Sequence, residues 1–188
     1  PRFNGQFAFM IWDRREKTLT VVRDRYGIRP LYILSLNSGC YFSSEMKAFD
    51  QIENFNRTID MAHLVEHALF WNTLGDRTIY RHIRSLEPGT YEVFENGRPA
   101  FSRRYYQIGE SQQKGPSDFA EAKEAFVDLL KDSVDLRLRS DVPVGAYLSG
   151  GIDSSVITLL TSKIKKEKLV SFSIAFSDRE FDESKYQQ

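Results

Sequence analysis

The sequence predicts two parts of different fold class, an α+β part over residues 1–106 and an α/β part with a parallel sheet over residues 118–188. Short apolar and aromatic runs separated by turn residues fill the first part, as in antiparallel hairpins. In the second part, apolar residues recur at helical spacing and are followed by a strand, a helix and a strand. The polar stretch 107–117, punctuated by glycine and proline, is the expected linker.

The elements of the first part follow from turn chemistry and from one capping residue. Asn96-Gly97 is the strongest turn signal, because both residue types tolerate a positive φ. Asp60 can accept hydrogen bonds from the first turn of a helix. In order, we expect strands at 7–12 and 19–22, strands at 31–36 and 41–43, a short helix at 44–49, a helix at 60–71, and a connecting hairpin formed by 90–95 and 99–102.

The elements of the second part alternate between helix and strand. Asp118 and Glu121 have the spacing of a capping box, and the apolar positions that follow predict a helix to about Leu138. A strand at 144–148, a helix at 153–166 and a strand at 169–176 come next. This order predicts parallel strands joined by a right-handed crossover. The loop after the first strand then lies at the carboxyl end of the sheet, where open α/β sheets bind ligands.

That loop reads Ser-Gly-Gly-Ile-Asp-Ser-Ser and carries the strongest functional signal of the chain. Adjacent glycines let the backbone approach a ligand closely, and the following helix presents unpaired N–H groups. With the serine hydroxyls, these groups predict a phosphate or pyrophosphate site, and a Mg²⁺ ion bound by Asp153 would relieve repulsion between its carboxylate and the phosphate. The loop is neither a Walker A nor a Rossmann motif. An ordinary capped Gly-rich turn is the alternative. The loop residues are Ser149, Gly150, Gly151, Ile152, Asp153, Ser154 and Ser155.

The same residues carry a resemblance to a known family. The loop is similar to the pyrophosphate-binding loop of adenylate-forming ATP pyrophosphatases, and its flanks narrow the resemblance to glutamine-hydrolysing asparagine synthetases. The segments that carry it, in order, are Asn4–Phe9, Arg23–Tyr32, Phe42–Phe49, Ser140–Gly145 and Phe181–Tyr186.

The resemblance implies a fold and a division of the chain. Residues 1–106 would be the C-terminal part of an N-terminal-nucleophile (class II) glutaminase domain plus a connecting hairpin. Residues 107–117 would be the linker, and residues 118–188 the start of a parallel-sheet ATP-pyrophosphatase domain. The chain would then be an internal fragment of a longer enzyme. Its glutaminase nucleophile would lie upstream of Pro1, so we expect no catalytic residue in the fragment and no activity from it alone.

The resemblance also implies an activity with its ligands. ATP and Mg²⁺ would adenylate aspartate with release of pyrophosphate, and ammonia from glutamine would then form asparagine. The implied ATP and pyrophosphate site consists of Leu148, Ser149, Gly150, Gly151, Asp153, Ser154, Ser155 and Ile174, with Leu148 and Ile174 framing the adenine and Asp153 holding the Mg²⁺. A cytoplasmic enzyme with small-molecule partners is expected, and a homodimer is allowed.

Three alternatives to this activity stay open. A related amidotransferase would amidate another acceptor, such as a sugar or a peptide. A relative similar to β-lactam synthetase would close a ring by adenylation without a working glutaminase. A non-catalytic nucleotide-binding relative would keep the fold with a degenerate site, although the intact loop argues against it.

Composition excludes several other classes of function. Basic and acidic residues both number 26, so no overall basic field favours nucleic acid. No apolar run reaches the ~18 residues of a membrane span. The single cysteine, Cys40, excludes an internal disulfide and is expected to be a structural thiol.

Two further charged clusters have competing interpretations. His63, Glu66 and His67 have the spacing of an inverted zinc-protease motif, but an amphipathic helix explains them better. The segment from Arg23 to Arg29 holds several charges, and we expect an Arg–Asp network that orders the loop rather than an active-site role.

Overall fold

The computed structural model describes residues 3–53, 55–109, 115–165, 168–178, 180 and 182–187. The chain divides into two compact units, residues 1–112 and 113–188, and each is considered by itself. The expected linker 107–117 overlaps this division, and its residues 110–114 lie outside the described part. No helix in the described part of the chain is long and apolar enough to cross a membrane.

The first unit contains two antiparallel sheets. The four-stranded sheet has the order β1 (Ala8–Asp13), β2 (Thr18–Arg23), β6 (Thr90–Glu95) and β7 (Arg98–Arg104). The three-stranded sheet has the order β4 (Gly39–Ser43), β3 (Tyr32–Leu36) and β5 (Ile83–Ser85). The turn between β6 and β7 places Asn96 at φ 50° and Gly97 at φ 74°, which is the geometry that Asn-Gly favours in a two-residue hairpin.

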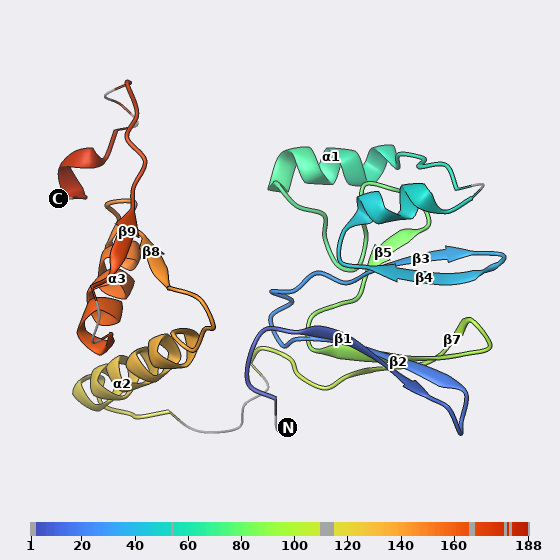
Figure 1. Cartoon of the computed structure of the whole chain (residues 1–188), viewed down its shortest axis with the longest axis horizontal. Helices are drawn as coiled ribbons and strands as arrows, with labels where there is room; N and C mark the ends of the chain where they lie inside the picture. The colour runs from blue at the N-terminus through green and yellow to red at the C-terminus, as the bar shows by residue number, and fades with distance from the viewer. Residues whose placement is uncertain are drawn as a thin grey trace. The chain divides into compact units, whose positions relative to one another are not determined.

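Both faces of the three-stranded sheet are covered. Successive residues of β3 point to opposite faces, and a buried residue lies on each. Ile33 points toward the four-stranded sheet and Leu34 toward η1 (Met46–Gln51), and both are fully buried. Figure 1 shows β3 and β4 between α1 (Met61–Phe70) and the β1–β2–β7 region. Asp60 caps α1 by accepting a hydrogen bond from the backbone N–H of Ala62, as expected.

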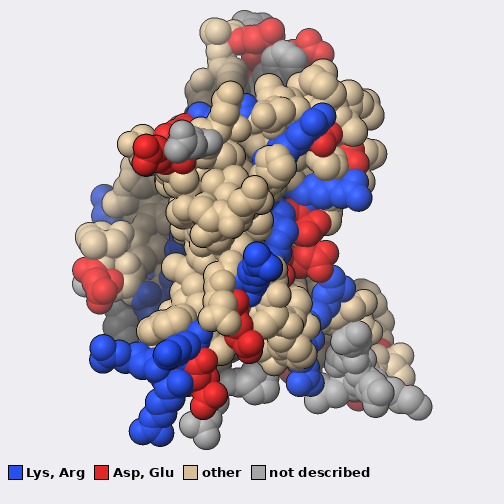
Figure 2. Space-filling view, turned by 90° about the vertical axis from the view of Figure 1, so that its right-hand side faces the viewer, with Lys and Arg blue, Asp and Glu red and all other residues tan. Residues whose placement is uncertain are grey.

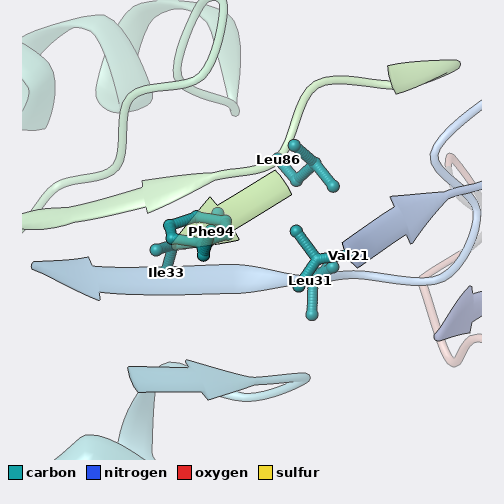
Figure 3. Close-up of a cluster of buried hydrophobic side chains, with 5 residues drawn as sticks. All are labelled: Val21, Leu31, Ile33, Leu86 and Phe94. Carbon is teal, nitrogen blue, oxygen red and sulfur yellow. The ribbon is translucent and has the colours of Figure 1, made fainter. Parts of the chain in front are cut away.

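The main core lies between the two sheets. It is built from five buried side chains that come from β2, β3 and β6, from the residue before β3 and from the residue after β5 (Figure 3). Phe42 of β4 adds an edge-to-face contact with Phe94, with ring centroids 4.9 Å apart. The five are Val21, Leu31, Ile33, Leu86 and Phe94.

A buried carboxylate orders the loop that joins the two sheets. The Asp24 side chain is 1% exposed and accepts hydrogen bonds from the backbone N–H groups of Phe7, Tyr26, Ile28 and Arg29 at 2.9–3.3 Å. Burial alone would raise the pKa of Asp24, but the backbone hydrogen bonds lower it below the ordinary 3.8.

The neighbouring Arg23 also orders this loop through its side chain. Its guanidinium donates to the carbonyl oxygens of Gly27, Arg29 and Leu86 at 2.6–3.0 Å, and to the Ser85 hydroxyl at 2.7 Å. The expected Arg–Asp network is therefore wrong in its pairing. Both charges bind backbone groups of the loop rather than each other, since neither appears among the ion pairs of the described residues.

The second unit has the predicted mixed α/β arrangement. The helix α2 (Phe119–Arg137) begins at its N-cap Asp118, which accepts from the N–H groups of Ala120 and Glu121. After it come β8 (Gly145–Tyr147), α3 (Ile152–Ile164) and β9 (Val170–Phe172), and β8 and β9 are parallel. A short turn, η2 (Ser184–Tyr186), follows. Residue 166, the expected end of the second helix, lies outside the described residues.

The sequence-based expectations were right about the hairpins and wrong about two strands and one role. The segment β5 was missed, and the β6–β7 hairpin is not a peripheral connection. Instead, β6 is an inner strand that pairs with β2 from Thr18↔Glu95 to Val22↔Tyr91. The expected strand 169–176 is shorter than predicted, because the chain leaves the sheet after Phe172.

Surface charge agrees with the balanced composition on the face that Figure 2 shows. Lysine and arginine side chains lie next to aspartate and glutamate side chains there, with broad uncharged areas between them. This face therefore carries no continuous field of one sign.

Two phenylalanines of neighbouring strands allow a matched test of the main core. Phe94→Ala should lower the free energy of unfolding by about 3–5 kcal/mol, because it leaves a cavity between the sheets. Phe101→Ala on β7 removes a side chain that is 51% exposed and should cost less than about 1.5 kcal/mol. Denaturant unfolding of both variants measures the difference, and equal losses would contradict the assigned core.

The buried carboxylate gives a second prediction. Asp24→Asn should lower the free energy of unfolding by about 2–4 kcal/mol, because the amide N–H groups face backbone N–H donors. Since the folded pKa of Asp24 is lowered, its contribution is present above the ordinary value of 3.8 and is lost as the pH falls through the folded pKa.

Urea unfolding between pH 2 and 7 tests both statements about Asp24. The pH dependence below about pH 4 should be shallower in the variant than in the unsubstituted protein. Asp13→Asn is the control, because Asp13 accepts two backbone hydrogen bonds in an exposed turn. A loss of stability at Asp13 equal to that at Asp24 would refute the role of burial.

Candidate phosphate-binding site

The predicted phosphate loop connects the end of β8 to the start of α3. Gly150 has φ +95°, and a Cβ atom built there would lie 3.1 Å from the Glu183 carbonyl oxygen and from Tyr186 Cβ. Glycine is therefore required at this position by backbone conformation and by space. The next residue, Gly151, is the N-cap of α3 and provides no side chain to cap it.

The three loop serines bind one another and the loop backbone. The hydroxyls of Ser154 and Ser155 donate to the Gly151 carbonyl oxygen at 3.0 and 2.8 Å. Ser154 Oγ lies 3.0 Å from Ser149 Oγ, and since the Ser154 proton is already used, Ser149 must be the donor of that pair. The serines thus shape the loop. In this arrangement their hydroxyl protons are not the free donors expected from the sequence.

Backbone N–H groups are the donors that the loop offers to an anion. No side chain caps the first turn of α3, and the first backbone bond of the helix runs from Ser155 N–H to the Gly151 carbonyl oxygen. The N–H groups of Ile152, Asp153 and Ser154 precede that bond at the positive end of the helix dipole. Phosphate oxygens fit this donor set.

Asp153 lies in the first turn of α3 and is exposed. No group of three or more histidine, cysteine, aspartate or glutamate side chains suited to a metal ion occurs among the described residues. A single carboxylate nevertheless suits Mg²⁺, which is commonly held by one or two protein carboxylates together with phosphates and water. Asp153 is therefore chemically suited to a Mg²⁺ ion that a phosphate also binds.

The structure distributes the predicted site residues between two cavities. Leu148, Ser149 and Ile174 line a cavity of about 310 Å³, which also receives the rings of Tyr147, Phe172 and Phe176. Asp153 and Ser154 line a second cavity, of about 570 Å³, between β8, α2 and α3. Gly150, Gly151 and Ser155 line neither of these two, and belong to the loop that separates them.

The segment from Asp182 to Gln187 lies against the loop and was not predicted as part of the site. The Gln187 side-chain amide donates to the carbonyl oxygens of Ser149 and Ile174, both at 3.1 Å. Asp182 accepts from the N–H groups of Phe176 and Ser184 and from the Ser184 hydroxyl, and the hydroxyl contact leads the causes that lower the pKa of Asp182. No local pattern signals these roles, because the partners of Gln187 are 13 and 38 residues away.

The histidine motif and the cysteine that were considered from the sequence make contacts that suit a structural role. His63 Nε2 lies 3.2 Å from the Arg77 guanidinium, and Nδ1 lies 3.8 Å from Asp60 Oδ1. A cation at Nε2 occupies the position that zinc would need, which argues against the zinc interpretation. Cys40 is half-buried in β4, with its sulfur 3.6 Å from Ser35 Oγ. Phe181 of the motif 181–186 lies outside the described residues.

Comparison with known proteins identifies both units separately. Residues 1–106 match the family model described as a glutamine amidotransferase domain, and residues 125–188 match the asparagine synthase model. One solved structure, the glutamine phosphoribosylpyrophosphate amidotransferase of Bacillus subtilis, aligns with 87% of this chain and 32% of its own at 16% identity. Its TM-score is 0.28, which is too low to argue from.

Curated relatives agree with the family models. The chain is 33% identical over 183 residues to glutamine-hydrolyzing asparagine synthetase 1 of Bacillus subtilis, which covers 97% of this chain and 28% of that protein. It is 33% identical over 189 residues to a putative glutamine-hydrolyzing asparagine synthetase 2 of Methanocaldococcus jannaschii, covering 98% and 36%. It is also 30% identical over 171 residues to Amidase chyE of Penicillium rubens, covering 87% and 24%.

The chain thus spans about a third, or less, of the length of these relatives. The amidotransferase match alone spans more than half of the 188 residues, and the asparagine synthase match follows it in the same chain. By this evidence the chain belongs to the glutamine amidotransferase domain family.

Proposed function

We propose that the protein containing this chain is a glutamine-hydrolysing asparagine synthetase. In this proposal it uses ATP to adenylate aspartate, releases pyrophosphate, and forms asparagine with ammonia taken from glutamine. The observation that carries the proposal is the set of backbone N–H groups at the start of α3, which follows the parallel strand β8; we call this set, with Gly150 and Gly151, the phosphate cradle. It lies within the asparagine synthase match. The amidotransferase match in the same chain supports glutamine as the source of nitrogen.

The residues of this chain would hold ATP in three ways. The N–H groups at the start of α3 would bind the phosphates that leave as pyrophosphate. Asp153 would hold a Mg²⁺ ion, which neutralises phosphate charge when bound. Leu148 and Ile174, with the aromatic rings around them, would hold the adenine in the cavity of about 310 Å³. The chemistry of ATP needs no lysine in the loop when the helix N-terminus and the metal provide the positive charge.

The same proposal divides the chain. Residues 1–106 would be the C-terminal part of the glutaminase domain with its hairpin, 107–117 the linker, and 118–188 the start of the ATP-binding domain. The separation into units at residue 112 is compatible with this division. A cytoplasmic location is part of the proposal, supported by the single cysteine.

Two of the relatives suggest a second candidate for the carboxylic acid that is activated. The chain is 30% identical over 87% of its length to two proteins named amidases, so the second candidate is a related enzyme that acts on another carboxylic acid or its amide. The two functions share the ATP site and the glutaminase domain, and differ in the carboxylic acid that is activated.

Pyrophosphate exchange in the full-length protein tests the function. Labelled pyrophosphate should enter ATP when aspartate is present, and glutamine should then support asparagine formation. Exchange with a different acid and none with aspartate would select the second acceptor class. ATP binding without exchange for any acid in a broad panel would refute both, and would favour a non-catalytic nucleotide-binding relative.

The conformation of Gly150 predicts that adding one methyl group at this position weakens ATP binding. Gly150→Ala should weaken ATP binding about 10-fold or more, because alanine at φ +95° is strained and its Cβ crowds the Glu183 carbonyl oxygen. Isothermal titration calorimetry of the full-length protein measures this. Gly115→Ala is the matched control, since nothing lies within 4 Å of a Cβ built there and its φ is not positive. An unchanged affinity in a folded Gly150 variant would contradict the cradle.

If Asp153 holds Mg²⁺, the effect of its substitution on ATP affinity should change sign when Mg²⁺ is removed. With Mg²⁺ present, Asp153→Asn should weaken ATP binding by roughly 10-fold, because a metal ligand is lost. With Mg²⁺ removed by chelation, the variant should bind ATP more tightly than the unsubstituted protein, because a carboxylate that repels phosphate is gone. The control is Asp132→Asn on the exposed surface of α2. A variant that is weaker by the same factor in both conditions would disprove the metal role.

A further inference from the structure

The carboxyl ends of β8 and β9 are joined by one side chain from a distant part of the unit. Gln187 Nε2 donates to the Ser149 carbonyl oxygen after β8 and to the Ile174 carbonyl oxygen after β9, both at 3.1 Å. Ser173 Oγ makes a similar connection by donating to the Leu148 carbonyl oxygen at 2.8 Å. These bonds hold the two strand ends together beyond the last residues of the sheet.

The chemistry of the two neighbours determines how the Gln187 amide is oriented. A primary amide has two N–H donors on nitrogen and an acceptor on oxygen. Both neighbouring groups are carbonyl oxygens, so only the nitrogen can face them, and both of its protons are used. The oxygen Oε1 is thereby directed away from both carbonyls. It accepts no hydrogen bond from any of the described residues, and the side chain is half-buried.

The rest of the cavity makes this acceptor useful for recognition. Gln187 lines the cavity of about 310 Å³, whose walls are largely aromatic and aliphatic: Tyr147, Leu148, Phe172, Ile174 and Phe176. Such walls bind a planar base without distinguishing one base from another. A fixed acceptor distinguishes bases, because a ligand with a donor forms a hydrogen bond where a ligand with a carbonyl meets repulsion.

The backbone around Gln187 limits the movement of this acceptor. The N–H of Tyr186 donates to the Glu183 carbonyl oxygen at 2.9 Å, and the N–H of Gln187 donates to the Ser184 carbonyl oxygen at 3.1 Å. Asp182 ties the start of the same segment to Phe176 and Ser184. The carbonyl of Glu183 and the side chain of Tyr186 also lie against Gly150 of the phosphate loop. A single segment therefore contacts both the base cavity and the phosphate cradle.

We infer that Gln187 is a specificity-determining residue, whose Oε1 accepts a hydrogen bond from the exocyclic 6-amino group of the purine base. This inference rests on the proposed ATP site. It predicts preference for a 6-aminopurine nucleotide over a 6-oxopurine nucleotide or one without a 6-substituent. Glu183 lines the same cavity and is the competing acceptor.

Binding of two nucleotides to two variants tests the inference. ATP and purine riboside triphosphate differ only in the 6-amino group, so the ratio of their dissociation constants measures recognition of that group. In the unsubstituted full-length protein ATP should bind about 3- to 10-fold more tightly, the effect of one hydrogen bond. In Gln187→Met, which keeps the length of the side chain, the ratio should fall to about one. Gln51→Met, at the end of η1 in the first unit, should keep the original ratio.

The outcomes separate this inference from the proposed function. If the unsubstituted protein binds neither nucleotide, the ATP site itself fails. If it binds both equally, the inference fails and the ATP site stands, whether or not the Gln187 variant folds. A ratio that survives in Gln187→Met but is lost in Glu183→Met, which removes the carboxylate acceptor, would also overturn the inference, and would assign recognition to Glu183.

Discussion

The Asp24 carboxylate is held without solvent by four backbone N–H groups, and much of the first unit depends on this arrangement. A buried charge is stable only when its hydrogen bonds are satisfied. Here that requirement fixes the path of the chain from β2 through the loop to β3. The backbone of Asp24 extends the effect, because its N–H and carbonyl groups bind Phe7 before β1 and Gly89 before β6. Arg23 adds the connection to Ser85 and Leu86. The two sheets thus keep the spacing in which their core side chains meet.

In the second unit, hydrogen bonds determine the shape of the phosphate loop. In the described part of this unit only Val134 and Thr161 are buried. Local and distant hydrogen bonds both fix the phosphate loop: Ser154 and Ser155 bind the Gly151 carbonyl oxygen nearby, and Gln187 binds the carbonyl oxygens after both strands. A loop shaped by its own hydroxyls leaves the helix N–H groups for a ligand. The serines are therefore needed for the geometry of the site rather than for direct donation.

Local patterns in the sequence predicted what local forces decide. The Asn96-Gly97 turn, the Asp60 and Asp118 caps, and the strand–loop–helix order around Gly150 depend on neighbours in the chain, and the structure confirms these elements. Pairing over long distances was not readable. The inner position of β6, the short strand β5 and the bridge made by Gln187 each need a partner tens of residues away. The charges of Arg23 and Asp24 were noticed but paired wrongly, because the sequence does not show where backbone groups point.

The bridge from Gln187 to Ser149 has a consequence for the order in which the chain is made. During synthesis, residues 149–155 leave the ribosome well before residue 187, so the loop first exists without the amide that joins β8 to β9. The first unit can pair all of its described strands once residue 104 has emerged. The two units thus mature at different times on the nascent chain, and the loop takes its final form only after the segment that holds it has been translated.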